Sequence, residues 1–190
     1  MDKPLRLGNH ARLRELARPH GDMVDVFSAH DPLELTRCTD GGAVREPSES
    51  ELTARLPERI WSTPYVGRRF PGSPSVAARP GLADGANCQF FAYEVLRHFG
   101  PRLPAWRSSD LWDDTVLTER VRESRPLDLA LFNADGRAWG AHVGVVVGED
   151  RILHLCAEVG RPVIWTLREF ATRERYRTLL GFKRPRPGGG

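Results

Sequence analysis

The stretch that decides the fold is NCQFFAYEVL, residues 87–96. Its apolar side chains recur at helical spacing, so it predicts a helix that begins at Cys88 with the thiol on the apolar side. The preceding DGAN, residues 84–87, is typical of a turn and a helix entry, and Gly100-Pro101 predicts the helix end. A thiol in the first helical turn lies near the positive end of the helix dipole, which favours the thiolate.

Upstream of this helix the chain has further helical patterns and no clear sheet. We expect short helices over residues 9–18 and 48–59, the second beginning with the capping box of Ser48 and Glu51. Residues 62–86 are rich in Gly, Pro, Ser and Arg, which predicts a surface lid or a linker.

Downstream, the hydrophobic period changes to that of strands. A helix capped by Ser108-Ser109-Asp110 comes first, and a second capping box, Thr166 with Glu169, predicts a helix to about Arg177. The tetrapeptide at 133–136, NADG, has the composition of a hairpin turn. Strands are expected at 127–132, 141–147, 151–156, 163–165 and 179–182. Helices first and an antiparallel sheet afterwards indicate an α+β fold.

Two histidines on neighbouring strands can meet if the loop between them has the right length. His142 begins the run at 141–147, and His154 lies in the run at 151–156. With a three-residue loop at 148–150, His154 lies opposite Gly144, and the two histidines become diagonal neighbours about 7–8 Å apart at the backbone. A two-residue loop would turn His154 to the other face.

These residues have the order that a cysteine nucleophile requires. In this arrangement Cys88 attacks a carbonyl, His142 acts as base and then as acid, and His154 orients the His142 ring. Backbone N–H groups at the helix start hold the oxyanion.

The motifs resemble those of the NlpC-type cysteine peptidases, papain-like endopeptidases of bacterial wall peptides, over about residues 61–183. The matching segments are PYVG at 64–67, NCQFF at 87–91, LDLALF at 127–132 and HVGVVVG at 142–148, with His154 twelve positions after His142. The resemblance implies a papain-like NlpC-type fold, with the nucleophile at a helix N-terminus packed on the sheet. It also implies a triad of Cys88, His142 and His154, with Tyr65 shaping the oxyanion site.

The residues around the nucleophile differ from the family motif. Asn87 stands in place of its aspartate, and Gln89 and Phe90 in place of its serine and glycine; these positions line the family's substrate cleft. We therefore expect a cytoplasmic enzyme acting on recycled stem peptides or on a small amide. Ser108, Ser109 and Trp139 are weaker candidates for the cleft wall.

Three functions fit these residues. The first is a thiol hydrolase that cleaves an amide or peptide bond through an acyl-enzyme on Cys88. The second is an acyltransferase or amide-forming enzyme that uses the same thioester. The third is a catalytically inactive domain that binds a partner.

The bulk properties exclude several other classes. A net charge of +3 is too small to indicate nucleic-acid binding, and no apolar stretch is long enough to span a membrane or has the form of a secretory signal. Cys38, Cys88 and Cys156 fit neither a disulfide framework nor a zinc site, so we expect a reducing compartment and no metal or other cofactor.

The expected division of the chain is an N-terminal helical extension at 1–60, packing on the core, a catalytic domain at 61–183 and a disordered tail at 184–190. The oligomeric state is left open.

Overall fold

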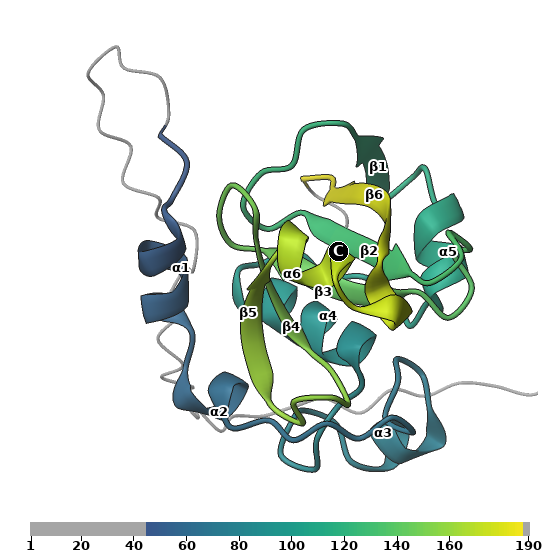
Figure 1. Ribbon diagram of the computed structural model, residues 1–190. Helices are drawn as coiled ribbons and strands as arrows, with labels where there is room; N and C mark the ends of the chain where they lie inside the picture. Colours follow the sequence, from purple (N-terminus) through teal and green to yellow (C-terminus); the bar gives the residue numbers. More distant parts are fainter. Residues whose placement is uncertain (1–44, 188–190) are drawn as a thin grey trace, which may run out of the picture. The chain divides into compact units, whose positions relative to one another are not determined.

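A computed structural model describes residues 45–187 of the chain, and it shows six antiparallel strands in one sheet with helices on both sides (Figure 1). The strands are β1 (Thr118–Val121), β2 (Leu129–Asn133), β3 (His142–Val146), β4 (Arg151–Leu155), β5 (Pro162–Thr166) and β6 (Thr178–Pro185), in the spatial order β1-β6-β2-β3-β4-β5. The helices are α1 (Glu49–Arg55), α2 (Glu58–Trp61), α3 (Pro74–Ala78), α4 (Cys88–His98), α5 (Ser108–Asp113) and α6 (Leu167–Ala171), with a 3-10 turn η1 (Glu174–Tyr176). The predicted α+β class is confirmed.

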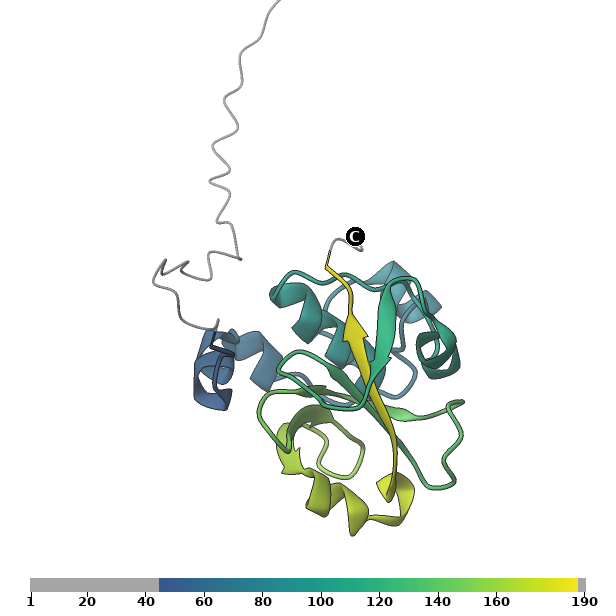
Figure 2. The same ribbon diagram turned by 90° about the horizontal axis from the view of Figure 1, so that it is seen from above.

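The sheet separates two hydrophobic clusters, which Figures 1 and 2 show as α4 on one side of the sheet and α6 on the other. On the α4 side, Phe91 and Leu96 pack against Val143. On the α6 side, Phe132 stacks on Phe170 at 3.9 Å between ring centroids. Burial of each such side chain contributes roughly 1.5–3 kcal/mol, so this packing holds both layers on the sheet.

Between β3 and β4, the turn that joins Val147 to Arg151 has three residues, 148–150, as the register argument required. The N–H of Val147 donates to the carbonyl of Arg151 at 2.9 Å, and Val145 pairs with Leu153. Continuing this register places His154 opposite Gly144, on the face shared with His142. The register prediction is confirmed.

The helical expectation for residues 48–59 needs correction, because Pro57 divides the segment. The capping box of Ser48 and Glu51 starts α1, which ends at Arg55, and α2 begins after Pro57. Proline lacks an N–H and restricts the residue before it, so one continuous helix cannot pass this point. Leu52 and Ile60 are both buried in the α4-side cluster.

Two further elements differ from expectation: a helix is shorter and a turn is longer. The capping box of Thr166 and Glu169 starts α6, but the helix ends at Ala171 and only the 3-10 turn η1 follows. The tetrapeptide at 133–136 does not make a tight hairpin, because the connection from β2 continues to His142. Asn133 organises the start of this longer loop by donating to the Arg137 carbonyl at 2.7 Å.

The C-terminal strand continues to Pro185 and is tied to the sheet by an ion pair. Arg184 donates from two nitrogens to the Asp128 carboxylate, at 2.8 and 2.9 Å, and Asp128 is only 2% exposed. Two residues of the segment 184–190 that we expected to be a tail are therefore part of the sheet.

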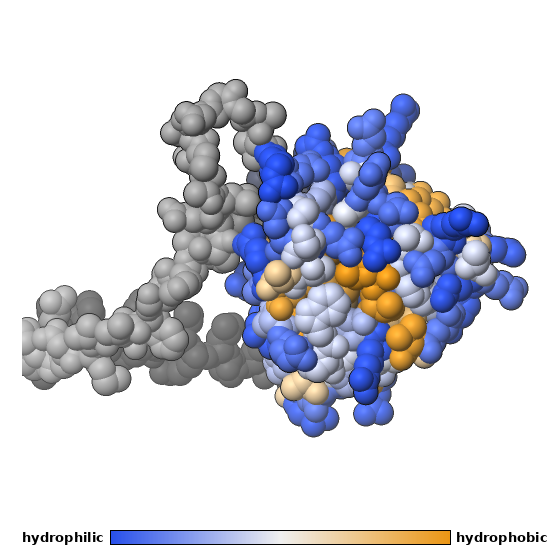
Figure 3. Space-filling view, turned by 60° about the vertical axis from the view of Figure 1, so that its left-hand side comes forward, coloured by the Kyte–Doolittle hydropathy of each residue, from blue (hydrophilic) through white to orange (hydrophobic). Residues whose placement is uncertain are grey.

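Several expectations concern residues that the structure does not describe. The helix over 9–18, Cys38 and the last three residues of the tail lie outside the described range 45–187. Within that range, no helix is both long enough and apolar enough to cross a membrane. Figure 3 shows one face of the molecule, on which a small apolar area is surrounded by hydrophilic residues.

Candidate active site

The segment that leads into α4 is held by one buried arginine. The Arg69 guanidinium is 2% exposed and donates to four backbone carbonyls, those of Ser75, Arg79, Gly81 and Gly85, at 2.7–2.9 Å. The Arg69 carbonyl in turn accepts the N–H of Asn87 at 2.8 Å. The part of residues 62–86 that precedes Cys88 is thus an internally bonded loop and not a linker.

Tyr65 is brought beside the helix entry by backbone pairing. Tyr65 forms an isolated parallel bridge with Ala86, and the N–H of Val66 donates to the Ala86 carbonyl at 2.8 Å. Gly85 has a φ of +86°, and a Cβ there would lie 2.6 Å from the Pro64 carbonyl oxygen. Only glycine therefore allows this close approach, which places Tyr65 in the same cavity wall as Cys88.

Asn87 caps α4 and leaves two N–H groups of the first turn available. Its Oδ1 accepts the N–H of Phe90 at 2.8 Å, and its carbonyl accepts the N–H of Phe91 at 3.0 Å. In the described part of the chain, the N–H groups of Cys88 and Gln89 donate to no backbone or side-chain oxygen, and both act on the Cys88 sulfur, whose pKa they lower. Two adjacent donors at a helix N-terminus can stabilise an anionic oxygen.

The electrostatics of Cys88 differ from the sequence expectation of a stabilised thiolate. Burial raises the pKa of the half-buried Cys88 thiol, and the N–H groups of Val143 and Gln89 oppose this effect without cancelling it. Desolvation disfavours the charged form more than the helix dipole favours it, so the free protein holds a neutral thiol. The influence of the Val143 N–H places the sulfur beside the start of β3, next to His142 in sequence.

His142 and His154 form a hydrogen-bonded pair. Nε2 of His142 lies 2.9 Å from Nδ1 of His154, and the two rings are nearly perpendicular, at 86°. If His142 donates its Nε2 proton to His154, its Nδ1 is left as the free base; we assign this tautomer on chemical grounds. Across residues 45–187, no hydrogen bond joins the Cys88 sulfur to either ring.

Both histidines are neutral because their surroundings are apolar. Burial lowers the pKa of His142 to about 3, with a further contribution from the positive charge of Arg175. Burial also lowers the pKa of His154 to about 2, and the ring lies between Trp165 and Phe170, at 4.3 and 4.6 Å between centroids. Nε2 of His154 is buried without a hydrogen-bond partner. Both imidazoles are therefore neutral in the free protein at neutral pH.

Cys88 and His142 open into one cavity of about 310 Å³. Most of the residues singled out in the sequence line it: Tyr65, Asn87, Cys88, Gln89, Ser108 and His142. His154 lies behind His142, and Ser109 is not part of the wall. Gln89 lines the cavity, but its amide nitrogen donates to the Tyr93 hydroxyl at 2.8 Å. Trp139 stands next to the cavity, against the guanidinium of Arg107 at 5.2 Å.

Three polar residues of the wall were not assigned to the site from the sequence. They are Asn133, Arg175 and Tyr176. Arg107, which precedes the expected cleft residue Ser108, also lines the wall. Tyr176 packs on the His142 ring at 4.6 Å between centroids. Arg175 and Tyr176 lie in a 3-10 turn that has no periodicity of its own, so no local pattern could have assigned them to the site. Cys156 is 1% exposed and also contributes to the wall.

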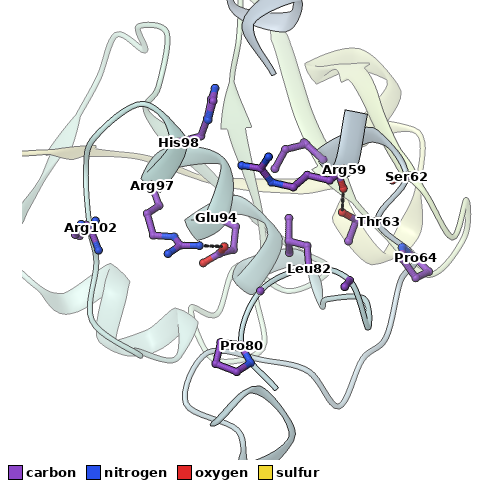
Figure 4. A pocket seen from close by; sticks show the side chains of 13 residues that line it. Arg59, Ser62, Thr63, Pro64, Pro80, Leu82, Glu94, Arg97, His98 and Arg102 are labelled. Atoms are coloured by element: carbon purple, nitrogen blue, oxygen red, sulfur yellow. Dashed lines mark hydrogen bonds and ion pairs between the residues drawn. The ribbon is translucent and has the colours of Figure 1, made fainter. Parts of the chain in front are cut away.

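A larger cavity, of about 780 Å³, lies at the other end of α4 and contains none of these groups. Figure 4 shows Glu94, Arg97 and His98 of α4 on one side of it and Leu82 on another. Its described lining has no nucleophile paired with a base, so the smaller cavity is the candidate active site. In the described residues, no group of three or more His, Cys, Asp or Glu side chains could hold a metal ion.

Comparison with known proteins gives matches among solved structures only; no protein-family model and no curated protein matches the chain. The chain is similar to the NlpC/p60 domain of the peptidoglycan hydrolase SagA, with 19% identity, a TM-score of 0.44, and coverage of 74% of this chain and 100% of that one. It is similar to the P60 domain of an antigen from M. avium subspecies paratuberculosis, with 17% identity, a TM-score of 0.44, and coverage of 72% and 96%. A lipoprotein-like NLP/P60 family protein from Staphylococcus aureus subsp. aureus has 21% identity, a TM-score of 0.46, and coverage of 77% and 45%. These structures carry the name of the family that the sequence motifs resemble.

Proposed function

We propose that the protein is a thiol hydrolase that cleaves an amide or peptide bond through an acyl-enzyme on Cys88. The observation that supports this most directly is the shared cavity, in which a helix-start cysteine meets a histidine whose ring is bound to a second histidine. This combination supplies a nucleophile, a base and an orienting group.

The reaction begins from a neutral thiol and a neutral imidazole. As substrate enters and excludes water, the Cys88 proton passes to Nδ1 of His142 while the sulfur attacks the carbonyl carbon. The N–H groups of Cys88 and Gln89 stabilise the negative oxygen of the tetrahedral intermediate. No hydrogen bond joins the Cys88 thiol to the His142 ring within residues 45–187. This is compatible with the proposal, because catalytic hydrogen bonds commonly form or shorten only when substrate is bound.

The intermediate collapses when His142 returns the proton to the leaving amine. The carbon–nitrogen bond breaks, the amine departs and a thioester remains on Cys88. Water then attacks the thioester with His142 as base, which releases a carboxylic acid and restores the thiol. If an amine takes the place of water, the same thioester produces a new amide, so acyl transfer is a variant of this chemistry.

One observation favours a different function, a binding domain without activity. Burial raises the pKa of the Cys88 thiol, and within the described residues the thiol has no hydrogen bond to His142. A buried neutral cysteine behaves as a small hydrophobic side chain. The cytoplasmic location expected from the sequence stays a prediction under either function.

Trapping the acyl-enzyme distinguishes these functions. We expect a dipeptide thioester to add its acyl mass to the wild-type protein, and not to Cys88→Ala, in intact-protein mass spectrometry. Cys156→Ala is the matched control and should still be acylated. Equal acylation of wild type and Cys88→Ala would contradict the proposal. Product masses with and without an added amine then separate hydrolysis from transfer.

A further inference from the structure

The active-site cavity is lined by positive charge and by no carboxylate. Its ionised lining side chains are Arg107 and Arg175, and no Asp or Glu is present in the described wall. Two acidic residues close in sequence to wall residues have partners: Asp110 accepts the backbone N–H of Arg107 at 2.9 Å, and Glu158 pairs with Arg173 at 3.3 Å. A ligand with a free amine would meet repulsion here, whereas an anionic ligand would be attracted.

Arg107 is positioned by two aromatic rings. Its guanidinium carbon lies 4.2 Å from the ring centroid of Phe70 and 5.2 Å from that of Trp139. Among residues 45–187, no hydrogen bond or ion pair engages the guanidinium itself. Contacts with ring faces leave the N–H edges of a guanidinium available, and those edges match the two oxygens of a carboxylate.

Trp139 extends this arrangement outside the cavity. It is 65% exposed, which is unusual for so large an apolar side chain, and it lies in the long loop between β2 and β3. By packing on Arg107 it restricts the guanidinium before any ligand arrives, and this restriction lowers the entropic cost of binding.

Arg175 approaches the cavity from the α6 side of the sheet, and its charge is felt by His142. Its positive charge lowers the pKa of His142, in addition to the larger effect of burial. A carboxylate bound near Arg175 would offset this charge and make His142 a stronger base. Substrate charge and catalysis would then be coupled.

We infer that the acyl part of the substrate carries a carboxylate, which Arg107 binds, with Arg175 adding attraction on the side of His142. This rests on the proposed function, because it specifies the substrate class of the same site. The chemistry that fits is an acidic peptide or a small dicarboxylic monoamide. Amides whose acyl part bears a free amine are disfavoured by the positive charge of Arg107 and Arg175.

A panel of three matched substrates tests this inference. The aminomethylcoumarin amide of an alanyl dipeptide is prepared with an N-succinyl group, an N-acetyl group or a free amine, which makes it anionic, neutral or cationic. We expect kcat/KM to be about tenfold or more higher for the succinyl than for the acetyl compound, since one hydrogen-bonded charge pair contributes about this factor, and to be lowest for the amine. Equal values, or a preference for the amine, would overturn the inference.

Arginine variants test whether Arg107 and Arg175 cause the preference for the anionic substrate. Arg107→Gln and Arg107→Lys should each reduce the succinyl-to-acetyl ratio of kcat/KM, because lysine cannot form the two-pronged contact. Arg175→Gln should reduce the same ratio, and this exposed residue offers a variant that does not depend on the aromatic packing of Arg107. Arg122→Gln removes an exposed arginine outside the cavity and should leave the ratio unchanged. If the succinyl-to-acetyl ratio of kcat/KM is the same in all four variants, the inference is contradicted.

Binding to Cys88→Ala separates this inference from the proposed function. Isothermal calorimetry of the three amides with this variant measures charge preference without turnover. Turnover by the wild type without a preference for the succinyl compound would refute the carboxylate site and support the hydrolase function. If the succinyl compound binds more tightly than the other two amides but the wild type turns over none of them, the hydrolase function is refuted and the carboxylate site is supported.

Discussion

Nε2 of His142 lies 2.9 Å from Nδ1 of His154, across two neighbouring strands whose register is set by a three-residue loop. The pair lies against Tyr176, Trp165 and Phe170, so neither ring can turn without displacing an aromatic neighbour. The orientation of the base is thus determined by packing and by one hydrogen bond together.

Replacement of His154 should lower turnover more than substrate binding. His154→Leu removes the partner of His142 Nε2 and leaves the tautomer of His142 unspecified, so we expect kcat to fall at least tenfold with little change in KM. His154→Gln keeps a polar group at this position and should retain more activity. A purely structural role would instead predict that the two variants fall in proportion to their loss of stability, measured by chemical denaturation.

Acid should destabilise the protein well above the usual carboxylate range. Both histidines have folded-state pKa values, about 3 and about 2, that lie below the value of 6.5 for the unfolded chain. Between these values the unfolded state binds more protons, so the free energy of unfolding falls as pH falls below about 6.5. The expected slope is about 1.4 kcal/mol per pH unit for each histidine, measured by urea denaturation between pH 6.5 and 4.5.

His154→Gln removes one of the two titrating groups and provides the control for this slope. The variant should show about half the wild-type loss of stability over the same pH interval. An unchanged slope would mean that other groups dominate the acid sensitivity.

Gly144→Ala should disturb the histidine pair through the strand spacing. A Cβ at this position would lie 2.5 Å from Cγ2 of Ile152 and 3.2 Å from Cβ of His154. Because both neighbours belong to β4, the strand must move, and we expect a loss of about 1–3 kcal/mol in the free energy of unfolding together with reduced activity.

The matched substitution is Gly148→Ala, in the loop after β3. A Cβ there would meet only side-chain atoms of Arg151 and Glu49, at 3.3–3.5 Å. Denaturation midpoints and hydrolysis rates of the two variants, measured side by side, check the expectation. Equal effects of both substitutions would show that the close approach at Gly144 is not required.

Arg69→Met should weaken the helix entry that carries the nucleophile. The substitution leaves four carbonyls without their donor, and each unsatisfied buried group costs about 1–3 kcal/mol before water replaces part of the loss. We therefore expect a decrease of about 3 kcal/mol in the free energy of unfolding. Arg68→Met alters an exposed neighbour and should change stability by less than about 0.5 kcal/mol. A small effect at Arg69 would mean that solvent readily reaches the loop.

Local patterns were sufficient for some parts of the site and not for others. The helical period placed Cys88 at the start of α4, and strand parity with an odd loop placed His142 beside His154. Both inferences depend on spacing along one or two adjacent elements. Arg69, Arg107 and Arg175 act through long side chains that cross between distant segments, and no spacing rule describes that reach.

The charge state of the thiol was also beyond sequence reasoning. The dipole of α4 could be anticipated, but the burial of Cys88 depends on the loops that surround it. The two helices at 49–61 have a different cause, because Pro57 is visible in the sequence and overrode a favourable capping box. The burial of a side chain by distant loops has no such local signal.

The four carbonyl contacts of the Arg69 guanidinium stabilise the segment that precedes Cys88 from within. The bonds of Arg69 run within residues 69–87 and fix the shape of this portion locally, while Leu82 and Ala86 pack it onto the core shared with the sheet. The loop from 134 to 141 is held by fewer internal bonds: the Asn133 side chain, the pair of Asp135 and Arg137, and the Ala141 N–H that donates to the Ala138 carbonyl. Protein engineers who wish to change the substrate should therefore insert or randomise residues in that outer loop, and transplant residues 65–88 as one cassette.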